Sequence, residues 1–211
     1  MKKNTATFSV VILAAGESKR FGSAKQLADF CGEPLLLAII RKVEACGVRP
    51  HIALGANIKL IRLHKTFLPF KEMVIDVQNW QLGLAESIKE SVAFFGGKQI
   101  NGIIFLLGDQ PLIDSEYLKH FFSRVEKYPS SLLCTAYATE KHNFGVPAYF
   151  PKEYFEYLLL LTGDQGAKRI LQAHNPYILN YAGSLLDIDE PDDLAHAKLM
   201  TCKAKSLIRR T

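Results

Sequence analysis

The chain has 211 residues, 48% hydrophobic and 22% charged, a composition that excludes an intrinsically disordered chain, a collagen-like repeat and a coiled coil. Its formal net charge of +5 arises from two tails, residues 1–6 and 202–211, which hold six basic and no acidic residues, while the rest carries 20 bases and 21 acids. We therefore expect no nucleic-acid partner and, because no run of about 18 apolar residues occurs, no membrane partner.

Along the first 130 residues, short apolar runs alternate with segments of helical periodicity. The apolar runs predict strands at 8–15, 50–55, 72–77 and 102–107. The periodic segments predict helices at 34–46, 58–68, 84–95 and 115–128, the last with Asp114 as its N-cap. This alternation predicts an α/β fold with a doubly wound, mostly parallel sheet. Ligands of such sheets bind at the carboxyl ends of the strands.

Beyond Ser131 the alternation loosens. Strands are predicted at 132–138, 146–150 and 177–181, helices at 151–161 and 165–174, and a final helix from Glu190. We therefore expect a mixed C-terminal half beside the parallel one. No internal repeat or linker divides the chain, which indicates a single domain over 1–211.

The N-terminus allows two interpretations. Lys2 and Lys3 before the apolar run 8–15 imitate a secretory signal, whereas a buried first strand of a parallel sheet has the same apolar pattern. The cysteines form no CxxC pair and no cluster with metal-ligand spacing, which predicts reduced thiols in a cytoplasmic protein; they are Cys31, Cys46, Cys134 and Cys202.

A glycine-bearing loop follows the first strand directly, with the sequence LAAGESKRFGSAK over residues 13–25. Backbone N–H groups of such a loop can wrap an anion, to which Arg20 and Lys25 can add charge. The loop fits neither GxxxxGK[ST] nor GxGxxG. The alternative is a surface turn with a few bases, but two small residues before Gly16 and cations four and nine positions after it favour an anion site.

Two acidic segments complete the candidate chemistry. Asp109 lies in GDQP at the carboxyl end of the strand 102–107, where one carboxylate plus substrate phosphates can hold Mg²⁺; the alternative is a turn residue. In DIDEPDDL, residues 187–194, alternation predicts Asp187 and Asp189 on the same side of a strand end. Helix-start chemistry accounts for the acids after Pro191 but not for these two.

Together these patterns resemble the nucleotidyltransferase family that includes molybdenum cofactor cytidylyltransferase and its guanylyltransferase relative. The resemblance spans roughly residues 8–200 and favours the first strand over the signal peptide. It also covers segments that resemble the family's base-proximal and second-substrate regions, namely Asn79-Trp80, Gly83-Leu84, Ser87-Ile88, Gly145-Val146-Pro147 and Gly163–Ala167. It implies a Rossmann-like nucleotidyltransferase fold with a nucleotide-binding half at 7–130, an acceptor-binding half at 131–200 and a basic tail at 202–211.

The resemblance also implies roles for single residues. Arg20, Lys25 and Asp109 match catalytic positions. Gly145, Pro147 and Asp164 match the acceptor region. Asp109 and Asp189 match the metal ligands, with Asp187 as the fallback for the second one. The nucleotide-binding positions are Leu13, Ala14, Ala15, Gly16, Arg20, Lys25, Gly83, Ser87 and Gly108.

The implied reaction is Mg²⁺-dependent transfer of CMP from CTP to the terminal phosphate of molybdopterin, with release of pyrophosphate. The double alanine at Ala14 and Ala15 favours CTP over GTP. Where cofactor cytidylyltransferases often have Gly-His-Pro, this chain has Gly145-Val146-Pro147, so a sugar phosphate or another small phosphorylated acceptor stays open. A third hypothesis is a non-catalytic nucleotide-binding factor that serves a client molybdoenzyme or its chaperone. An attacking phosphate needs no protein nucleophile, so positioning and charge neutralisation would supply the catalysis.

Overall fold

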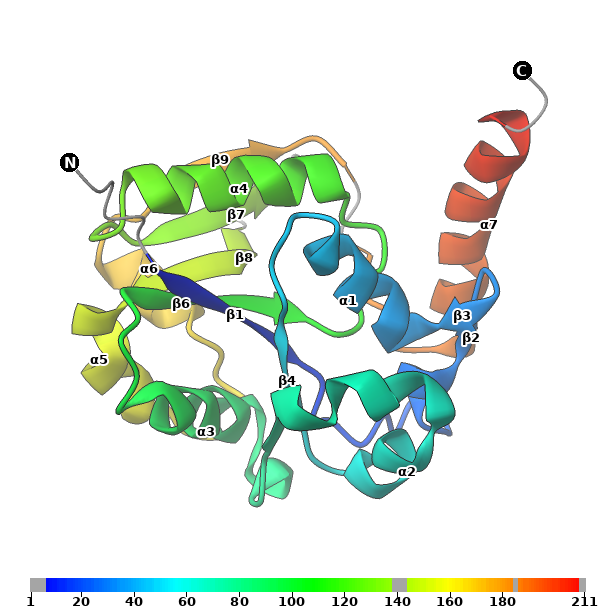
Figure 1. Ribbon diagram of the computed structural model, residues 1–211, viewed down its shortest axis with the longest axis horizontal. Coiled ribbons are helices and arrows are strands. Elements are labelled where there is room, and N and C mark those ends of the chain that lie inside the picture. Colours follow the sequence, from blue (N-terminus) through cyan, green and yellow to red (C-terminus); the bar gives the residue numbers. More distant parts are fainter. Residues whose placement is uncertain (1–6, 138–143, 184–185, 209–211) are drawn as a thin grey trace.

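The computed structural model describes residues 7–137, 144–183 and 186–208, except for the side chains of 202–208. At its centre lies a seven-stranded sheet with the order β5–β4–β1–β6–β8–β7–β9 (Figure 1). β8 is antiparallel to both of its neighbours, and the other strands share one direction. The strands are β1 Phe8–Leu13, β4 His51–Leu54, β5 Val74–Asp76, β6 Gly102–Leu107, β7 Leu133–Tyr137, β8 Phe144–Pro151 and β9 Tyr177–Tyr181. The predicted mostly parallel α/β sheet is confirmed.

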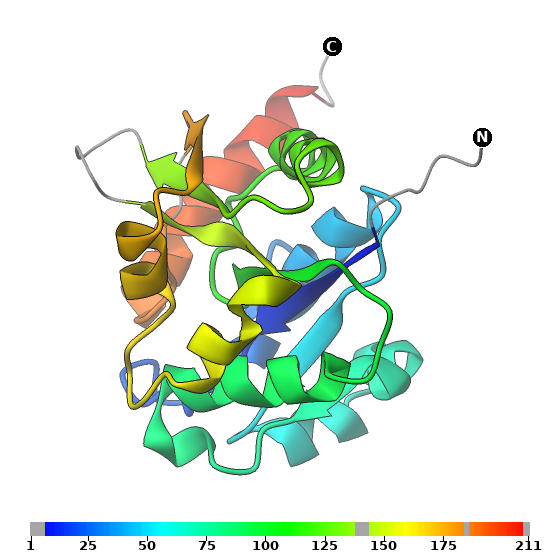
Figure 2. The same ribbon diagram turned by 90° about the vertical axis from the view of Figure 1, so that its left-hand side faces the viewer.

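Helices cover both faces of this sheet, with α4 and α3 on opposite sides (Figure 2). The longer elements are α1 Leu35–Glu44, α2 Ile58–Leu63, η2 Lys65–Met73, α3 Leu84–Phe95, α4 Ser115–Lys127 and α7 Pro191–Ile208. The shorter ones are η1 Lys25–Leu27, η3 Trp80–Leu82, η4 Lys152–Tyr154, α5 Phe155–Leu159 and α6 Lys168–Ala173.

The apolar runs of the sequence form strands that are buried on both faces. In β1, Val10 and Ile12 pack into a core with residues of α1, α2 and α4. Val11 and Leu13 pack into a second core with residues of α3, α5 and α6. Because successive side chains of a strand point to opposite faces, a central strand must be apolar throughout, and this explains the nearly continuous apolar runs.

The order of the strands reverses between β1 and β6. From β1 the chain moves outward to β4 and β5, and it then returns to pair β6 with the other side of β1. The loops after β1 and β6 therefore diverge from adjacent carboxyl ends. In doubly wound sheets this switch point is where ligands bind.

The two-stranded hairpin of β2 (Asp29–Phe30) and β3 (Glu33–Pro34) was not predicted. Its Phe30 packs with Ile188 and with Leu194 of α7 in a third, smaller core, and α7 lies beside the hairpin in Figure 1. Cys31 in its turn is disulfide-bonded, so the prediction of reduced thiols is wrong for this residue, whereas Cys46 and Cys134 are free. Spacing gave no sign of the bond, because the fold decides which cysteines meet.

Several element bounds agree with the predictions, and the departures have local causes. The predicted strands 102–107 and 177–181 and helix 84–95 are observed as such. The predicted helix 58–68 instead ends at Leu63 and continues as η2, which contains Pro69, a residue without an N–H to donate. β8 begins at Phe144, ahead of the predicted start, because Phe144 pairs with Ala136 of β7. Ala138, the predicted end of β7, lies outside the described residues.

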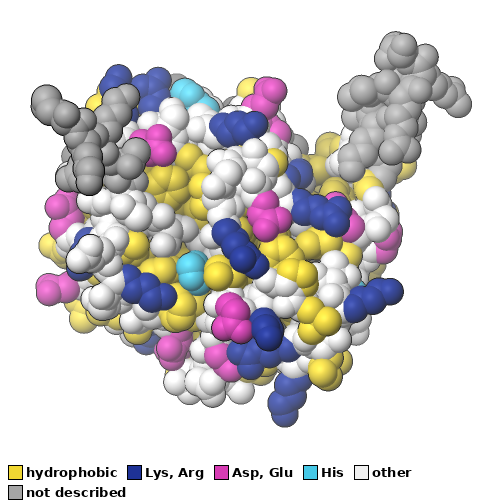
Figure 3. Space-filling model, viewed as in Figure 1, with side chains coloured by type: hydrophobic (Ala, Val, Ile, Leu, Met, Phe, Trp, Pro, Cys, Tyr) yellow, Lys and Arg dark blue, Asp and Glu magenta, His cyan; other side chains and the backbone are white. Residues whose placement is uncertain are grey.

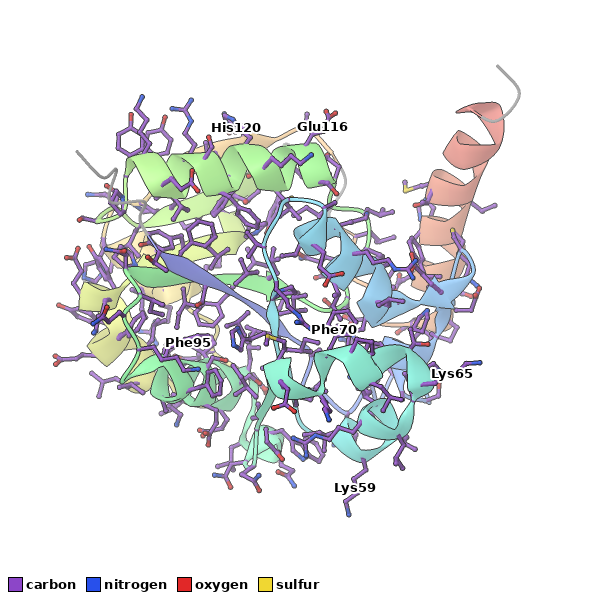
Figure 4. All side chains as sticks on the ribbon, viewed as in Figure 1. Lys59, Lys65, Phe70, Phe95, Glu116 and His120 are labelled. Atoms are coloured by element: carbon purple, nitrogen blue, oxygen red, sulfur yellow. The ribbon has the colours of Figure 1, made fainter. Side chains whose placement is uncertain are left out.

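The helices present apolar side chains to the sheet and polar ones to solvent. Figure 4 shows Phe95 of α3 and Phe70 of η2 pointing inward and Glu116 and His120 on the outer side of α4. On the face seen in Figure 3, basic and acidic side chains are interspersed. In the described ranges, we find no helix that combines the length and the hydropathy of a membrane span.

The predicted N-cap at Asp114 provides a test of the fold. Its Oδ1 accepts the Tyr117 N–H at 2.6 Å, and its Oδ2 accepts the Tyr181 hydroxyl of β9 at 3.0 Å. We expect Asp114→Ala to lower the free energy of unfolding by about 1–2 kcal/mol, because both bonds are lost. Lys119→Ala, an exposed change in the same helix, should stay within about 0.5 kcal/mol. Equal urea unfolding curves for the two variants would contradict the capping role.

Candidate active site

A cleft of about 550 Å³ lies at the switch point between β1 and β6. The structure brings together there all nine residues that were predicted to bind the nucleotide, and with them Asp109 and Asp189. Its walls also include Ser18, Gln26, Trp80, Gln81 and Asp164. Gly108 permits the close approach of the two strand ends: its N–H donates to Leu13 O at 2.9 Å, and a Cβ there would lie 2.8 Å from Cβ of Ala14.

The loop after β1 turns its carbonyls into the protein. Nε2 of Gln26, which is 3% exposed, donates to Ala14 O at 3.0 Å and Gly16 O at 3.1 Å, and its Oε1 accepts Asn57 Nδ2 at 3.2 Å. Ala15 O accepts the N–H of Ala56 at 3.0 Å. The N–H of Ala14 is already bonded to Ala53 O at 2.9 Å, and the carbonyls of Ala14, Ala15 and Gly16 are occupied. The N–H groups of Ala15 and Gly16 are therefore the candidates of this loop for binding an anion.

Ser18 adds a hydroxyl to this loop. Its φ of 64° lies in the left-handed region, which is unusual for a residue other than glycine. Its Oγ is buried and has no hydrogen-bond partner among the described residues. A strained residue with an unpaired donor at a cleft wall fits a ligand with acceptor oxygens.

Lys25 connects the two carboxylates of the cleft. Its Nζ donates to Asp109 Oδ2 at 2.8 Å, Asp189 Oδ1 at 3.2 Å and Ile188 O at 2.8 Å. Burial alone would lower the pKa of Lys25, but the charges and hydrogen bonds of Asp109 and Asp189 outweigh it and raise the pKa, so the ammonium stays charged. Arg20 pairs with the other oxygen of Asp189 at 2.7 Å.

A buried backbone contact brings the two acidic segments together. Ile188, with no exposed surface, donates its N–H to Asp109 O at 2.9 Å. From α1, Lys42 Nζ donates to Pro111 O and to Ile113 O, which holds the chain just after Asp109. The sequence separation of Asp109 and Asp189 is thus closed by the main chain and does not depend on the side chains alone.

The prediction that Asp187 and Asp189 lie on one side of a strand end is wrong. Residues 186–189 form no strand, and the anchored Ile188 stands between two acids that line different cavities. Asp187 turns to Gln110, whose Nε2 donates to it at 2.8 Å. Burial raises the pKa of the Asp187 carboxyl, and the nearby negative charges of Asp109 and Asp189 add to this.

The carboxylates of Asp109 and Asp189 fit a hard divalent cation. Both contact one Lys25 nitrogen, so their bonded oxygens lie no more than about 6 Å apart. Oδ1 of Asp109 is buried and has no hydrogen-bond partner in the described part of the chain. No group of three or more His, Cys, Asp or Glu gathers among these residues, which suits Mg²⁺, an ion that proteins hold through one or two carboxylates, substrate phosphates and water.

A second cavity of about 370 Å³ adjoins the cleft, and the two share Leu13, Leu84 and Leu107 as walls. Gly145, predicted to contact the acceptor, lines this second cavity. Pro147 lines neither cavity, because its neighbours Val146 and Ala148 line the second one and successive side chains of a strand point to opposite faces. Its carbonyl oxygen accepts the Thr135 hydroxyl at 3.0 Å.

Asp164, the third predicted acceptor residue, lines the cleft between β1 and β6 instead. The N–H of Ala85 donates to Gly163 O at 3.0 Å and fastens this segment to the start of α3. Gly83 adopts a φ of 105°, and a Cβ there would lie 2.4 Å from the carbonyl carbon of Gly163, so only glycine fits this contact. Asp164 therefore faces the same space as the loop after β1.

Sequence reasoning missed Gln26 and Asn57, which support the loop but carry no charge. The available signal was a polar residue between Lys25 and the apolar Leu27, where a buried amide must find partners. Ser18 was part of the quoted motif, but its backbone strain is visible only in the structure.

A glycine-bearing loop at a switch point, faced by a lysine and two carboxylates, is the arrangement expected of a nucleotide-binding α/β enzyme of the nucleotidyltransferase class. The model of the MobA-like NTP transferase domain matches residues 10–177, and the chain belongs to this family. It is similar to the purine catabolism protein PucB of Bacillus subtilis, 27% identical over 195 residues that cover 87% of this chain and 92% of PucB.

Solved structures share this fold. Rv0371c from Mycobacterium tuberculosis H37Rv superposes with a TM-score of 0.75 at 26% identity, covering 92% of this chain and 99% of that one. The structure of its complex with manganese superposes with a TM-score of 0.73 at 23% identity, with the same coverage of both chains. A nucleotidyl transferase from Methanothermobacter superposes with a TM-score of 0.75 at 18% identity, covering 94% of this chain and 99% of that one. At identities this low the likeness concerns the fold alone.

The role of Gln26 can be tested by an isosteric change. A carboxylate in Gln26→Glu cannot donate to Ala14 O and Gly16 O, so we expect the loop to lose the conformation that leaves its N–H groups available to an anion. Two hydrogen bonds of about 1 kcal/mol each predict nucleotide binding weaker by roughly 10-fold or more. Calorimetry measures this affinity. Gln81→Glu, which adds the same charge at the cleft wall, is the control, and equal losses in both variants would refute the supporting role.

Proposed function

We propose that this nucleotidyltransferase transfers CMP from CTP to the terminal phosphate of molybdopterin and releases pyrophosphate. The observation that supports this most is the meeting of Lys25, Asp109 and Asp189 within hydrogen-bonding distance beside the loop after β1. The proposal treats residues 1–211 as one working unit, with the nucleotide cleft and the second cavity as its two substrate sites.

In this reaction the residues position and neutralise the phosphates. An oxygen of the acceptor phosphate forms a bond to the α-phosphorus as the bond from that phosphorus to pyrophosphate breaks. The N–H groups of Ala15 and Gly16 hold the phosphates, and Lys25 and Arg20 offset charge on the leaving pyrophosphate. A phosphate dianion is already a nucleophile near pH 7, so the chain supplies no base.

Asp109 and Asp189 are the proposed ligands of the metal. The unpartnered Oδ1 of Asp109 and the short span to Asp189 support this role, as does the manganese complex of Rv0371c. Bound Mg²⁺ supplies neutralisation of charge at the α-phosphate. Asp187 contributes no ligand in this proposal, because it turns to Gln110.

The second cavity is the proposed acceptor site, and its walls favour a flat heterocycle over a sugar. Its apolar lining comes from both halves of the chain, including Ile88, Phe105, Phe144, Phe150 and Leu171. Four polar residues also line this cavity: Gln110, Tyr137, Lys168 and Asp187. The apolar majority of the lining favours a pterin, which buries its faces against apolar surface, over a sugar phosphate with its many hydroxyls. The non-catalytic hypothesis is weakened by the retained lysine and carboxylate pair.

The choice of CTP depends on Ala15. This residue is 4% exposed and its carbonyl is fixed by Ala56, so its methyl group cannot move aside for a larger base. A cytoplasmic location and a client molybdoenzyme belong to the same proposal. The disulfide of Cys31 is unusual for that compartment.

Pyrophosphate release tests the function. We expect release from CTP only when molybdopterin is present, and kcat/KM for CTP at least about 10-fold above that for GTP, because a purine needs space that Ala15 occupies. Release of pyrophosphate with a sugar phosphate but not with molybdopterin would show that the acceptor is a sugar phosphate. Faster use of GTP would overturn the choice of nucleotide, and no release with any acceptor would favour the non-catalytic hypothesis.

The metal ligands are tested by removing charge while keeping shape. Asp109→Asn and Asp189→Asn should each lower Mg²⁺-dependent turnover by about 10²-fold or more, and excess chelator should abolish the wild-type reaction. Asp187→Asn is the matched control and should retain its dependence on Mg²⁺ concentration. A shift in that dependence for Asp187→Asn alone would move the second ligand to Asp187.

A further inference from the structure

We propose that Lys25 acts as an internal counter-ion that blocks the metal site until a nucleotide binds. In the free protein its ammonium stands between Asp109 and Asp189, the carboxylates that would hold the metal. A nucleotide triphosphate gives Lys25 another partner and thereby releases the carboxylates. This inference rests on the metal site of the proposed function and adds an order of events to it.

The hydrogen bonds of Lys25 support this role. An ammonium has three N–H donors, and here one goes to each carboxylate and one to Ile188 O. With Arg20 on Asp189 Oδ2, three of the four carboxylate oxygens are bonded to protein cations. The remaining one, Oδ1 of Asp109, is buried and unpartnered among the described residues. Because both oxygens of Asp189 are bonded, a metal held by both carboxylates must displace Lys25 or Arg20.

The local charges lead to the same conclusion. The two carboxylates are balanced by the Lys25 and Arg20 charges bonded to them, so these four groups together exert little net attraction on a divalent cation. Asp187 and Asp193 also lie close enough to interact with the Lys25 charge. Lys25 is the stronger of the two counter-ions, because its side chain is 14% exposed, whereas that of Arg20 is 67% exposed and screened by water. Removal of the lysine charge alone leaves a net charge of −1 in a partly buried space.

The main chain around Lys25 allows the side chain to move alone. Gln26, the next residue, is fixed by its bonds to Ala14 O and Gly16 O. The Lys25 side chain has four rotatable bonds, and it lines the same cleft as the loop after β1. Phosphates on that loop compete for the ammonium, so metal and nucleotide should each strengthen the binding of the other, as thermodynamic linkage requires.

Mn²⁺ binding without nucleotide tests this inference, with free Mn²⁺ followed by electron paramagnetic resonance. We expect Lys25→Met to bind Mn²⁺ at least about 10-fold more tightly than the wild type, because it removes the competing charge. Lys25→Gln is the second variant should the first fail to fold. Lys19→Met removes an equal charge that pairs with Glu17 and not with the carboxylates, and it should change the affinity less than about 2-fold.

Two further measurements separate the possible failures. A non-hydrolysable CTP analogue should tighten Mn²⁺ binding more in the wild type than in Lys25→Met, and adding Asp109→Asn to Lys25→Met should abolish the gain. Unchanged or weaker Mn²⁺ binding by both Lys25 variants would overturn the inference and leave the proposed function intact. Tighter binding by the variants, with no wild-type turnover on CTP and molybdopterin, would support the inference and refute the acceptor.

Discussion

The pairing of β1 with β6 is the constraint on which the rest of the site depends. Leu13 and Leu107 are register partners, and Gly108 continues the contact through its bond to Leu13 O. This pairing places the loop after β1 and the loop after β6 side by side, although almost a hundred residues separate them. The buried Ile188 then adds a third segment through its bond to Asp109. The loop that is proposed to bind phosphates and the two carboxylates thus meet through main-chain contacts.

The pattern of the sequence was sufficient for the parallel half of the fold. Buried strands must be apolar on both faces, and helices such as 84–95 must carry an apolar stripe, so both leave a periodic signal. The hairpin of β2 and β3 left none, because two-residue strands have no period. The sequence could place Asp187 and Asp189 near the site, but it could not predict which way their side chains point. The direction of Asp187 follows from the burial of Ile188 and not from strand alternation.

The polar residues of the site also divide into those that the sequence predicted and those that only the structure shows. Charged side chains in a glycine-bearing loop are visible in the sequence, and Arg20 and Lys25 lie where that loop suggested. Gln26 acts through an uncharged amide whose partners are carbonyls, and carbonyls carry no side-chain signature. Asp164 reached the cleft through a backbone bond between Ala85 and Gly163, a contact between segments that no local pattern connects.

The reversed direction of β8 has a consequence for how this protein can diversify. Because β8 runs against β6, its first residues, not its last, lie at the ligand-binding edge of the sheet, and there Phe144, Gly145 and Val146 form a wall of the second cavity. The groups that are proposed to hold the phosphates come from loops that leave β1 and β6. The two cavities therefore draw much of their lining from separately encoded stretches of chain. Substitutions at the start of β8 can reshape one cavity while the hydrogen bonds around Lys25 stay as they are.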